Sequence, residues 1–427
     1  MPVPIYYVGK PAEVEHHARP LFADFDVRIE DENEVLRHAQ PGDVCVFYNE
    51  FFPRYRTAVH ELVQKRCATL YALDGIFEWR SLWEFPPGMS CLWSARPILS
   101  HKVACVGRSQ ARILESWGHE AQSELVGIPR FDGLLNRSPR VRAKGEPFVI
   151  LVLTAKCAGF NEEQLQRASR SLRDLKAWLD AHPHVGGTAI RSVWRITQGL
   201  EKEVGVDNSL KDTTGDDLAQ ILTKVDAVIT TPSTSLLEGM LQQVPVAMLD
   251  YNNCPHYVPA AWRITASTHF DQVVPELVNP ALAKMHYQQH LLRDSLECHS
   301  PALPRLVQLI ERMHELAQRS LREDGILSFP HRILQNVEAL PVAEAIPLDY
   351  ARLFPANPAF ADGDVRRLQT EVADLRVALQ TLRDASAREL REVQIRFGIE
   401  PVSLRKRLRR AVRRVFPKRD RSQNRAA

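Results

Sequence analysis

Short apolar runs alternate with amphipathic stretches along the first 250 residues, in two successive sets. The apolar runs end at polar or glycine positions, which is typical of strands, and the stretches between them have helical spacing. The first set comprises candidate strands at 5–9, 43–49, 68–75 and 102–107, with candidate helices at 56–66 and 108–118. Residues 136–147, NRSPRVRAKGEP, then have the composition of a linker.

The second set begins with FVILVLTA at 148–155, a continuous apolar run expected of a strand buried on both faces. Helix-length segments separate the runs that follow, and this indicates parallel sheets covered on both faces. The set comprises candidate strands at 148–155, 189–197, 226–231 and 245–251, with candidate helices at 162–182, 216–225 and 235–243. We therefore predict an α/β chain with two doubly wound Rossmann-like domains facing a cleft, at 1–140 and 146–325.

Beyond Tyr251 the pattern becomes helical to about residue 323, and these helices are predicted to trail the second domain. A Pro-rich linker is expected at 326–362. A near-heptad seam then predicts a coiled coil at 363–397 that could pair two chains. The apolar seam positions are Leu368, Val372, Leu375, Leu379, Leu382 and Val393.

The C-terminal residues 401–427 form a basic tail with eleven Lys or Arg against one acid, Asp420. The formal charge of the whole chain is +3, so residues 1–400 are mildly acidic. Within the tail, 404–416 places apolar residues on one helical face and cations on the rest, which favours an anionic membrane surface. A nucleic-acid arm is disfavoured because Phe416 is a lone aromatic, and a solvated tail without a partner stays open.

The 427 residues have ordinary globular composition, with 44% hydrophobic and 25% charged residues. The N-terminus lacks the pattern of a signal peptide, and no apolar stretch approaches the length of a membrane span. The seven scattered cysteines include no CxxC pair and suggest reduced thiols. We expect a cytoplasmic protein, peripheral on the inner face of the membrane. No DxD or HxxH pattern lies in a suitable loop, so neither a bound metal nor another cofactor is expected.

The strongest candidate site is the segment ITTPSTSLLEGMLQQVPVAMLDY, residues 229–251. Ligands of open parallel sheets bind beyond the carboxyl ends of the strands, where Ser233, Thr234 and Ser235 precede a helix. Glu238, one turn further on, could accept hydrogen bonds from a ribose. However, Ser235 and Glu238 also fit the capping-box pattern S-x-x-E, in which the glutamate serves only its own helix. The pattern alone leaves both interpretations open.

Two segments resemble GT-B fold glycosyltransferases and their relatives, which include CDP-glycerol glycerophosphotransferases, UDP-N-acetylglucosamine 2-epimerases and capsule-type surface-carbohydrate enzymes. The first is the segment 227–251. The second is 106–134, which ends in the signature G-x-P-R-x-D at Gly127, Pro129, Arg130 and Asp132. The resemblance implies that Ser233, Thr234 and Ser235 hold donor phosphates and that Glu238 holds the ribose. It also implies donor binding by Arg130.

Many of these relatives carry a His-Pro pair after the second strand of the C-terminal domain, whereas this chain has VWRITQG, with Arg195 near that position. An arginine there can still hold a phosphate. Lys156, after the first strand of that domain, could neutralise a diphosphate. At the end of an N-domain strand, Asp74 and Glu78 are the candidate catalytic residues. Glu50 and His256 are weaker candidates for the cleft.

The resemblance implies a glycosyltransferase that uses a nucleotide-activated sugar in the synthesis of a bacterial surface polysaccharide or glycoconjugate. Its partners would be a nucleotide-sugar donor and a carbohydrate or lipid-linked acceptor. One alternative is a transferase of glycerol or ribitol phosphate from a CDP-linked donor. A different class is a non-catalytic GT-B-like scaffold that recruits partners through its coiled coil and tail.

Overall fold

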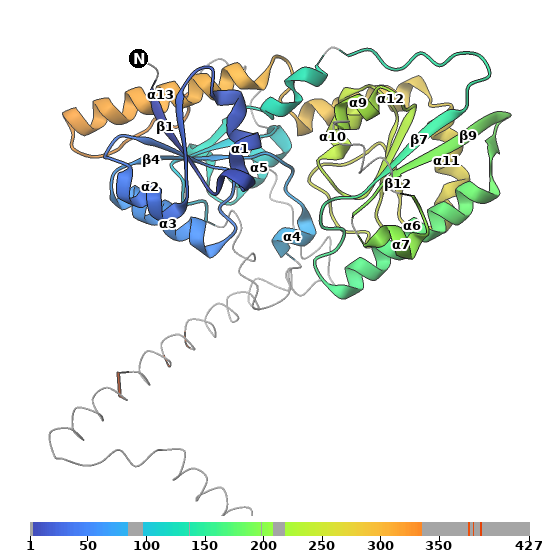
Figure 1. Ribbon diagram of the computed structural model, residues 1–427, viewed down its shortest axis with the longest axis horizontal. Coiled ribbons are helices and arrows are strands. Elements are labelled where there is room, and N and C mark those ends of the chain that lie inside the picture. The colour runs from blue at the N-terminus through green and yellow to red at the C-terminus, as the bar shows by residue number, and fades with distance from the viewer. Residues whose placement is uncertain are drawn as a thin grey trace, which may run out of the picture. The chain divides into compact units, whose positions relative to one another are not determined.

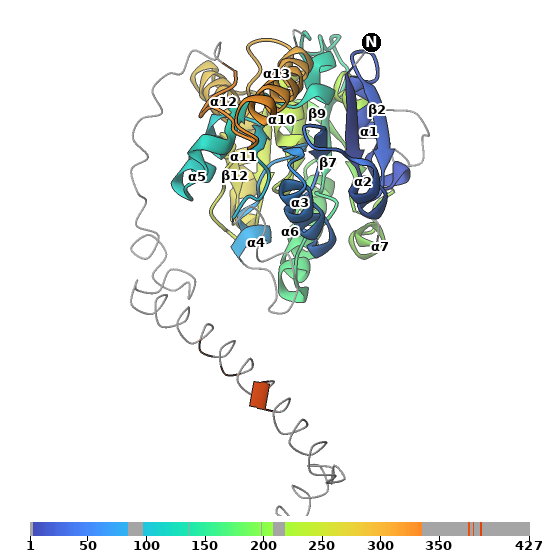
Figure 2. The same cartoon turned by 90° about the vertical axis from the view of Figure 1, so that its left-hand side faces the viewer.

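The computed structural model describes residues 3–83, 97–135, 137–197, 199–207 and 218–334, with four further residues, Leu375, Leu379, Ala385 and Ser386. Two six-stranded sheets form its framework, within one compact unit of residues 1–346. Helices lie on both faces of each sheet (Figure 1, Figure 2). The predicted fold class, two doubly wound α/β domains of GT-B type, is confirmed. The predicted coiled coil and basic tail lie outside the described residues, apart from those four positions.

The N-terminal sheet is entirely parallel, in the order β2-β1-β3-β4-β5-β6. Its strands are β1 (Pro4–Val8), β2 (Asp26–Glu30), β3 (Val44–Phe47), β4 (Ala68–Ala72), β5 (Lys102–Cys105) and β6 (Ser123–Leu125). The helices between them are α1 (Pro11–Ala18), η1 (Arg19–Leu21), α2 (Glu32–His38), α3 (Pro53–Gln64), α4 (Trp79–Trp83), α5 (Arg108–Ser116), η3 (Glu120–Gln122) and η4 (Pro129–Leu134). The strand order reverses between β1 and β3, which makes a topological switch point there.

The C-terminal sheet has the order β12-β11-β10-β7-β9-β8 and repeats this winding, with its switch point between β7 and β10. Its strands are β7 (Phe148–Leu153), β8 (His184–Val185), β9 (Thr188–Arg195), β10 (Ala227–Thr230), β11 (Val246–Leu249) and β12 (Trp262–Ile264). The helices are α6 (Glu162–Ala181), α7 (Leu200–Val204), α9 (Leu218–Leu222), α10 (Ser235–Leu241), η5 (Ser267–His269), α11 (Phe270–Val278) and α12 (Leu282–Ser295). Among the described strands of this sheet, only the short β8 is antiparallel to its neighbour.

The central strands are apolar throughout because both of their faces are covered. All four residues of β3 and all six of β7 are buried. On the N-terminal sheet, alternate residues contact either α2 and α3 or α1 and a long final helix, α13 (Ala302–Glu323). This explains why continuous apolar runs predicted these strands well.

The final part of the described chain differs from the prediction in two ways. Residues after Tyr251 first form a strand, β12, before the helices begin. The helix α13, predicted to trail the C-terminal domain, packs instead on β3 and β4 of the N-terminal sheet. The apolar stripe of α13 that includes Leu309, Ile310 and Met313 is completely buried there. An amphipathic pattern indicates that a face is buried but does not say against which domain.

The first residues of the predicted linker also belong to the N-terminal domain. Ile333 and Leu334 are buried, and their backbone N–H groups donate to the carboxylate of Glu124 at 2.7 and 3.2 Å. Glu124 forms an ion pair of 2.8 Å with Lys102, which is fully buried. Residues 330–334 are therefore a strap fixed on β5 and β6, and the linker prediction is wrong for them.

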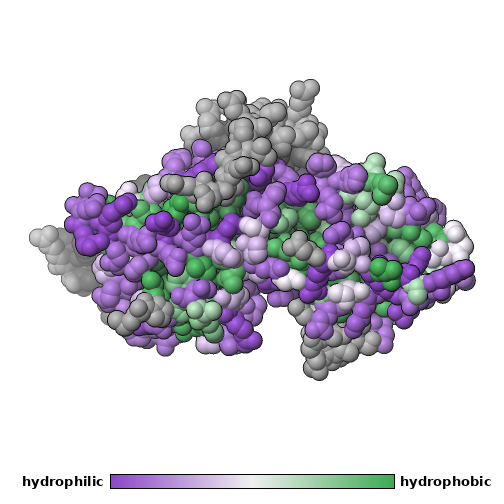
Figure 3. Space-filling view, turned by 90° about the horizontal axis from the view of Figure 1, so that it is seen from above, coloured by the Kyte–Doolittle hydropathy of each residue, from purple (hydrophilic) through white to green (hydrophobic). Residues whose placement is uncertain are grey.

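The two domains share an apolar core. Phe77, Phe131 and Leu134 from the N-terminal domain pack in one cluster with Leu236 and Met240 from the C-terminal domain. A continuous hydrophobic interface of this kind restrains relative domain motion. The face seen in Figure 3 carries both hydrophilic and apolar patches. Among the described residues, no helix is both long enough and apolar enough to cross a bilayer.

Candidate functional site

A cavity of about 820 Å³ opens between the domains, at the carboxyl ends of strands from both sheets. It includes the loops that follow β7 and β10, at the switch point where doubly wound sheets bind ligands. All nine site residues predicted from the sequence line this one cavity, and their roles stay predictions. They are Asp74, Glu78, Arg130, Lys156, Arg195, Ser233, Thr234, Ser235 and Glu238.

Threonines tie the three loops of the C-terminal domain together at the cavity floor. Thr154 and Thr197 share a hydroxyl–hydroxyl hydrogen bond of 2.7 Å, which joins the loops after β7 and β9. The Thr231 hydroxyl accepts from the Ala155 N–H at 2.8 Å and joins the loop after β10. The hydrogen bonds fix the backbone of this floor before any ligand arrives, which limits the entropy lost on binding.

Two cations of the C-terminal domain face the cavity. Lys156 follows β7 and is exposed to it. Arg195 ends β9, and its Nη1 atom is buried without a hydrogen-bond partner among the described residues. A buried guanidinium nitrogen without a partner is costly, and an anion such as a phosphate would satisfy it. This pair therefore makes the C-terminal side of the cavity suited to an anion.

Glu238 does not act as a capping residue. The N-cap of α10 is Thr234, without a side-chain capping bond, and the Ser235 hydroxyl bonds with that of Thr230 at 2.9 Å. The carboxylate of Glu238 instead accepts a hydrogen bond of 3.0 Å from Arg130 Nη1 at the cavity wall. The capping box that the sequence allowed is therefore not formed, and Glu238 faces the cavity, whereas its binding of a ligand stays a prediction.

Arg130 connects the two domains. Its Nε donates to Asp74 Oδ1 at 3.0 Å, and its Nη2 donates to the Asp74 carbonyl at 3.2 Å. Close beside this contact, the Ile76 N–H donates to the Thr234 hydroxyl at 3.2 Å. A Cβ at Gly75 would lie 2.9 Å from that hydroxyl oxygen, so glycine permits the approach.

The four signature residues of the second motif have separable roles in the structure. Gly127 has φ +94, and a Cβ there would lie 2.5 Å from the Glu297 carbonyl oxygen. Pro129 begins η4, which directs Arg130 into the cavity. Asp132 accepts from the N–H groups of Ala302 and Leu303 at 2.6 and 2.8 Å and so caps α13. The motif therefore supplies one cavity residue and also holds the returning helix.

Replacing Asp132 with alanine should lower the free energy of unfolding by about 1–2 kcal/mol, the usual cost of losing a helix cap. The exposed Asp24, replaced in the same way, should change it by less than about 0.5 kcal/mol. Chemical denaturation of both variants measures the difference. Equal stability of the two variants would contradict a capping role.

Asp74 is held as a carboxylate by partners on two sides. His17 Nδ1 lies 3.2 Å from its Oδ2, opposite the contact with Arg130. Burial opposes its ionisation, but the His17 hydrogen bond and the Arg130 charge outweigh burial and lower the pKa of Asp74. An ion-paired carboxylate of low pKa is a weak base, so its predicted catalytic role is less favoured than one as an electrostatic anchor.

His16, which the sequence did not single out, lines the cavity from the N-terminal domain. Its ring centroid lies 3.7 Å from that of His17. Partial burial and the neighbouring His17, Lys156 and Arg130 lower the pKa of His16, despite the opposing effect of Asp74. The neutral imidazole is therefore the main form at pH 7 and can accept a proton. The paired histidines shortly after the first strand were the signal available in the sequence.

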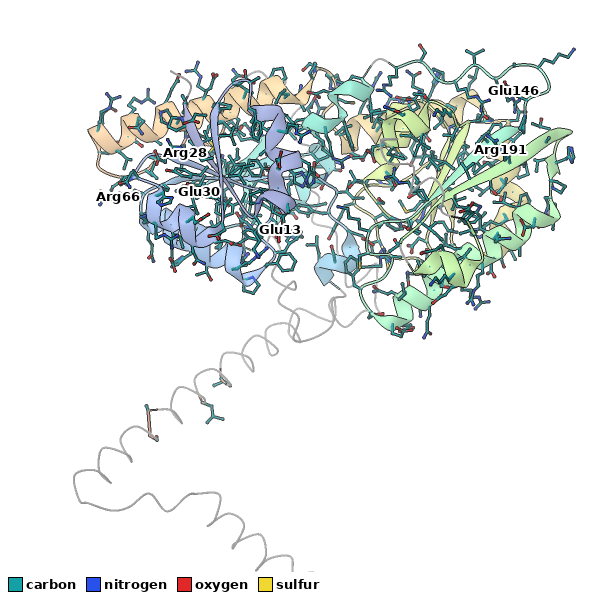
Figure 4. The ribbon with its side chains drawn as sticks, viewed as in Figure 1. Glu13, Arg28, Glu30, Arg66, Glu146 and Arg191 are labelled. Atoms are coloured by element: carbon teal, nitrogen blue, oxygen red, sulfur yellow. The ribbon has the colours of Figure 1, made fainter. Side chains whose placement is uncertain are left out.

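The helix that carries these histidines is fixed to its neighbour. Glu13 lies on α1 (Figure 4). It accepts hydrogen bonds from Arg54 at 2.8 Å and from the Tyr55 hydroxyl at 3.1 Å. Tyr48 stacks on His17 with 5.3 Å between ring centroids. These contacts set the position of His16 before a substrate binds.

Glu78 forms an ion pair with Arg80, which is buried and also donates to the Ala158 carbonyl across the domain boundary at 3.2 Å. The ion pair makes Glu78 a less favoured base. Glu50 and His256 do not line the cavity. Glu50 accepts hydrogen bonds from Leu99 and Ser100, and His256 Nε2 lies 3.1 Å from Asp250 Oδ2. Among the described residues, no group of three or more His, Cys, Asp or Glu could hold a metal ion.

Comparisons with known proteins find similarity to solved structures alone. No protein-family model matches the sequence, and no curated protein matches it. Solved structures similar to this chain include the wall teichoic acid polymerase TagF, at 12% identity and a TM-score of 0.48, covering 75% of this chain and 90% of that one. A UDP-N-acetylglucosamine 2-epimerase from Listeria monocytogenes has 11% identity and a TM-score of 0.47, covering 74% and 97%.

The MnaA protein of S. aureus, solved with UDP, has 11% identity and a TM-score of 0.47, covering 73% of this chain and 96% of that one. Neither an activity nor a ligand of this chain follows from similarities at this level.

Proposed function

We propose that this chain transfers a glycosyl group from a nucleotide-activated sugar to an acceptor hydroxyl, in the synthesis of a surface polysaccharide. The main support is the convergence of three cations and three hydroxyl residues on one cavity at the switch point of the C-terminal sheet. The most specific feature is the buried Nη1 of Arg195. It has no hydrogen-bond acceptor among the described residues, and a donor phosphate would supply one.

In this proposal, the donor diphosphate occupies the cavity side formed by Lys156, Arg195 and the Ser233–Ser235 hydroxyls. Glu238 accepts hydrogen bonds from the ribose, and Arg130 holds Glu238 in place when the cavity is empty. As the bond from the anomeric carbon to the diphosphate breaks, negative charge grows on the leaving group. The cations stabilise this charge, and they do so best where water is excluded.

The acceptor approaches from the N-terminal domain, where His16 removes the proton from its attacking hydroxyl. Asp74 binds His17, and His17 packs against the His16 ring, so both act as positioning residues. His16 is preferred as base over Asp74 and Glu78, since both carboxylates are committed to ion pairs. A neutral imidazole with its pKa near or below neutrality suits this task.

Nucleotide binding is tested by thermal shift with UDP-, GDP-, CDP- and CMP-linked donors. We expect donors with one kind of nucleobase to stabilise the folded protein. The stabilisation should be about 2.7 kcal/mol when the donor concentration is a hundred times its dissociation constant. Arg195→Met should weaken that binding by about 10- to 100-fold, the usual loss for a charged hydrogen bond. Arg191→Met, exposed on the same strand, is the matched control and should bind normally.

The pattern of responses also separates the alternatives. If the protein turns over CDP-glycerol or CDP-ribitol and releases CMP, its function is transfer of an alditol phosphate and not glycosyl transfer. No response to any of these donors, in a chain that melts cooperatively, would contradict both enzyme proposals and favour a scaffold. Glu238→Gln keeps the size of the side chain, so a loss of binding in this variant would assign the carboxylate to the ligand.

A further inference from the structure

A second cavity, of about 600 Å³, lies between the outer face of α13 and the strap at 330–334. Among the described residues, it shares no lining residue with the first cavity. The charged residues that line it in the described part of the chain are four arginines and one acid: Arg312, Arg319, Arg322, Arg332 and Glu315. We call this surface the arginine groove.

The spacing of the helical arginines gives the groove its charge. Arg312, Arg319 and Arg322 follow one another at seven and three residues, which places them on one face of α13 over about 15 Å. Glu315 pairs with Arg312 at 2.7 Å. Among the described residues, neither Arg319 nor Arg332 has an ion-pair partner within 4 Å. Like charges gathered this way repel one another unless an anion lies between them.

The opposite wall is held in place by buried polar groups. Lys102 Nζ donates to the carbonyls of Pro330 and His331 at 2.8 and 3.0 Å, on one side of Arg332. Glu124 accepts from the N–H groups of Ile333 and Leu334 on the other side. The backbone that carries Arg332 is therefore fixed opposite α13, and the groove is a built feature of the fold.

An exposed apolar side chain lies in the turn that joins the two walls. The turn follows α13, and Leu327 and Phe329 within it pack against the N-terminal core. Ile326, by contrast, is 69% exposed. A single outward apolar residue beside clustered guanidinium groups is the arrangement of a surface that contacts lipid headgroups and the outer acyl chains.

We propose that the arginine groove docks the chain on an anionic membrane, with phospholipid phosphates bound by Arg319, Arg322 and Arg332 and Ile326 inserted into the interface. Guanidinium groups suit this ligand because they pair with phosphate through two parallel hydrogen bonds. The inference does not depend on the reaction in the cleft. It concerns a folded surface, distinct from the basic tail at 401–427.

The test uses the full chain in co-sedimentation with vesicles of phosphatidylglycerol and phosphatidylcholine, against phosphatidylcholine alone. Arg319→Glu combined with Arg332→Glu should weaken binding to the anionic vesicles by at least about tenfold. The control lies in the other domain and combines Arg173→Glu on α6 with Arg191→Glu on β9. Arg191 is labelled in Figure 4. It changes the net charge equally, and its binding should stay within about twofold of the wild type. All variants keep the basic tail. A difference in vesicle binding between the two double variants therefore measures the contribution of the arginine groove.

Ile326→Asp should also weaken vesicle binding, and the loss should persist in high salt, where the arginine contribution is screened. Unchanged melting temperatures would show that all variants are folded. Equal losses in both double variants would overturn the proposal, since only overall charge would then matter. A second result would also overturn the proposal. In it, inorganic phosphate stabilises the wild type but not the Arg319→Glu, Arg332→Glu variant, while both bind vesicles equally well. The groove would then bind a soluble phosphate instead of a membrane.

Discussion

Replacing His16 with glutamine should lower kcat by about 10²- to 10⁴-fold, the usual contribution of a positioned general base. Glutamine keeps a polar side chain of similar reach but cannot take up a proton. Nucleotide binding should stay within about twofold, because His16 belongs to the N-terminal domain whereas the predicted donor residues, apart from Arg130, lie in the C-terminal domain. Steady-state kinetics and thermal shift on the same preparation measure the two effects.

The pH dependence carries the more specific part of this prediction. A base is active when deprotonated, so the rate falls as pH drops through its pKa. Burial and nearby cations lower the pKa of His16 from its ordinary value near 6.5, so the acid limb of the wild type should lie below that pH. The limb should disappear in His16→Gln. His17→Gln should reduce kcat less and keep the limb, as expected of a positioning residue.

His60→Gln is the control, because this histidine is exposed on α3 outside the cavity. It should leave kcat and the pH profile unchanged. Full activity of His16→Gln with an unaltered acid limb would exclude His16 as the base and restore Asp74 and Glu78 as the leading candidates.

The cavity residues of the C-terminal domain could be predicted from two things: the apolar pattern of the strands, and the rule that places ligands at one edge of a parallel sheet. Continuous apolar runs marked β7 and β10, and ligands of parallel sheets bind at the carboxyl ends of such strands. Lys156 and Ser233 therefore followed from their position in the sequence. Glu238 was harder, since a capping box and a ligand contact share one pattern, and only the contact with Arg130 separated them.

The N-terminal half of the site was predicted less well, for a physical reason. His16 lies on the short helix α1, whose apolar contacts are few and whose amphipathic pattern is correspondingly weak. Its relation to the cavity depends on contacts distant in sequence, such as that between His17 and Asp74. The placement of α13 on the N-terminal sheet is similar, since the sequence shows a buried stripe but not its partner.

Replacing Lys102 with methionine should lower the free energy of unfolding by about 3–5 kcal/mol, the typical cost of leaving a buried charge unpaired. The side chain is fully buried, and its ammonium group has four acceptors: Glu124 and the carbonyls of Ala121, Pro330 and His331. Burial lowers the pKa of Lys102, although Glu124 opposes this shift. The four acceptors around Nζ favour the charged form of the side chain against the effect of burial.

Urea denaturation measures the loss, as a lower midpoint at unchanged slope. Lys176→Met is the matched control, because its ion pair with Asp180 on α6 is exposed and should contribute less than about 1 kcal/mol. A stability of Lys102→Met equal to that of the control would contradict the network role.

The double variant Lys102→Met with Glu124→Leu should not recover the lost stability, although replacing a buried ion pair by apolar residues is often neutral. Here the pair also satisfies backbone groups of the strap, and the N–H groups of Ile333 and Leu334 would lose their acceptor. Hydrogen exchange at these two amides should be faster in the double variant than in Lys102→Met, which keeps Glu124. Since the same strap carries Arg332, faster exchange should accompany weaker vesicle binding if the pair holds the arginine groove in shape.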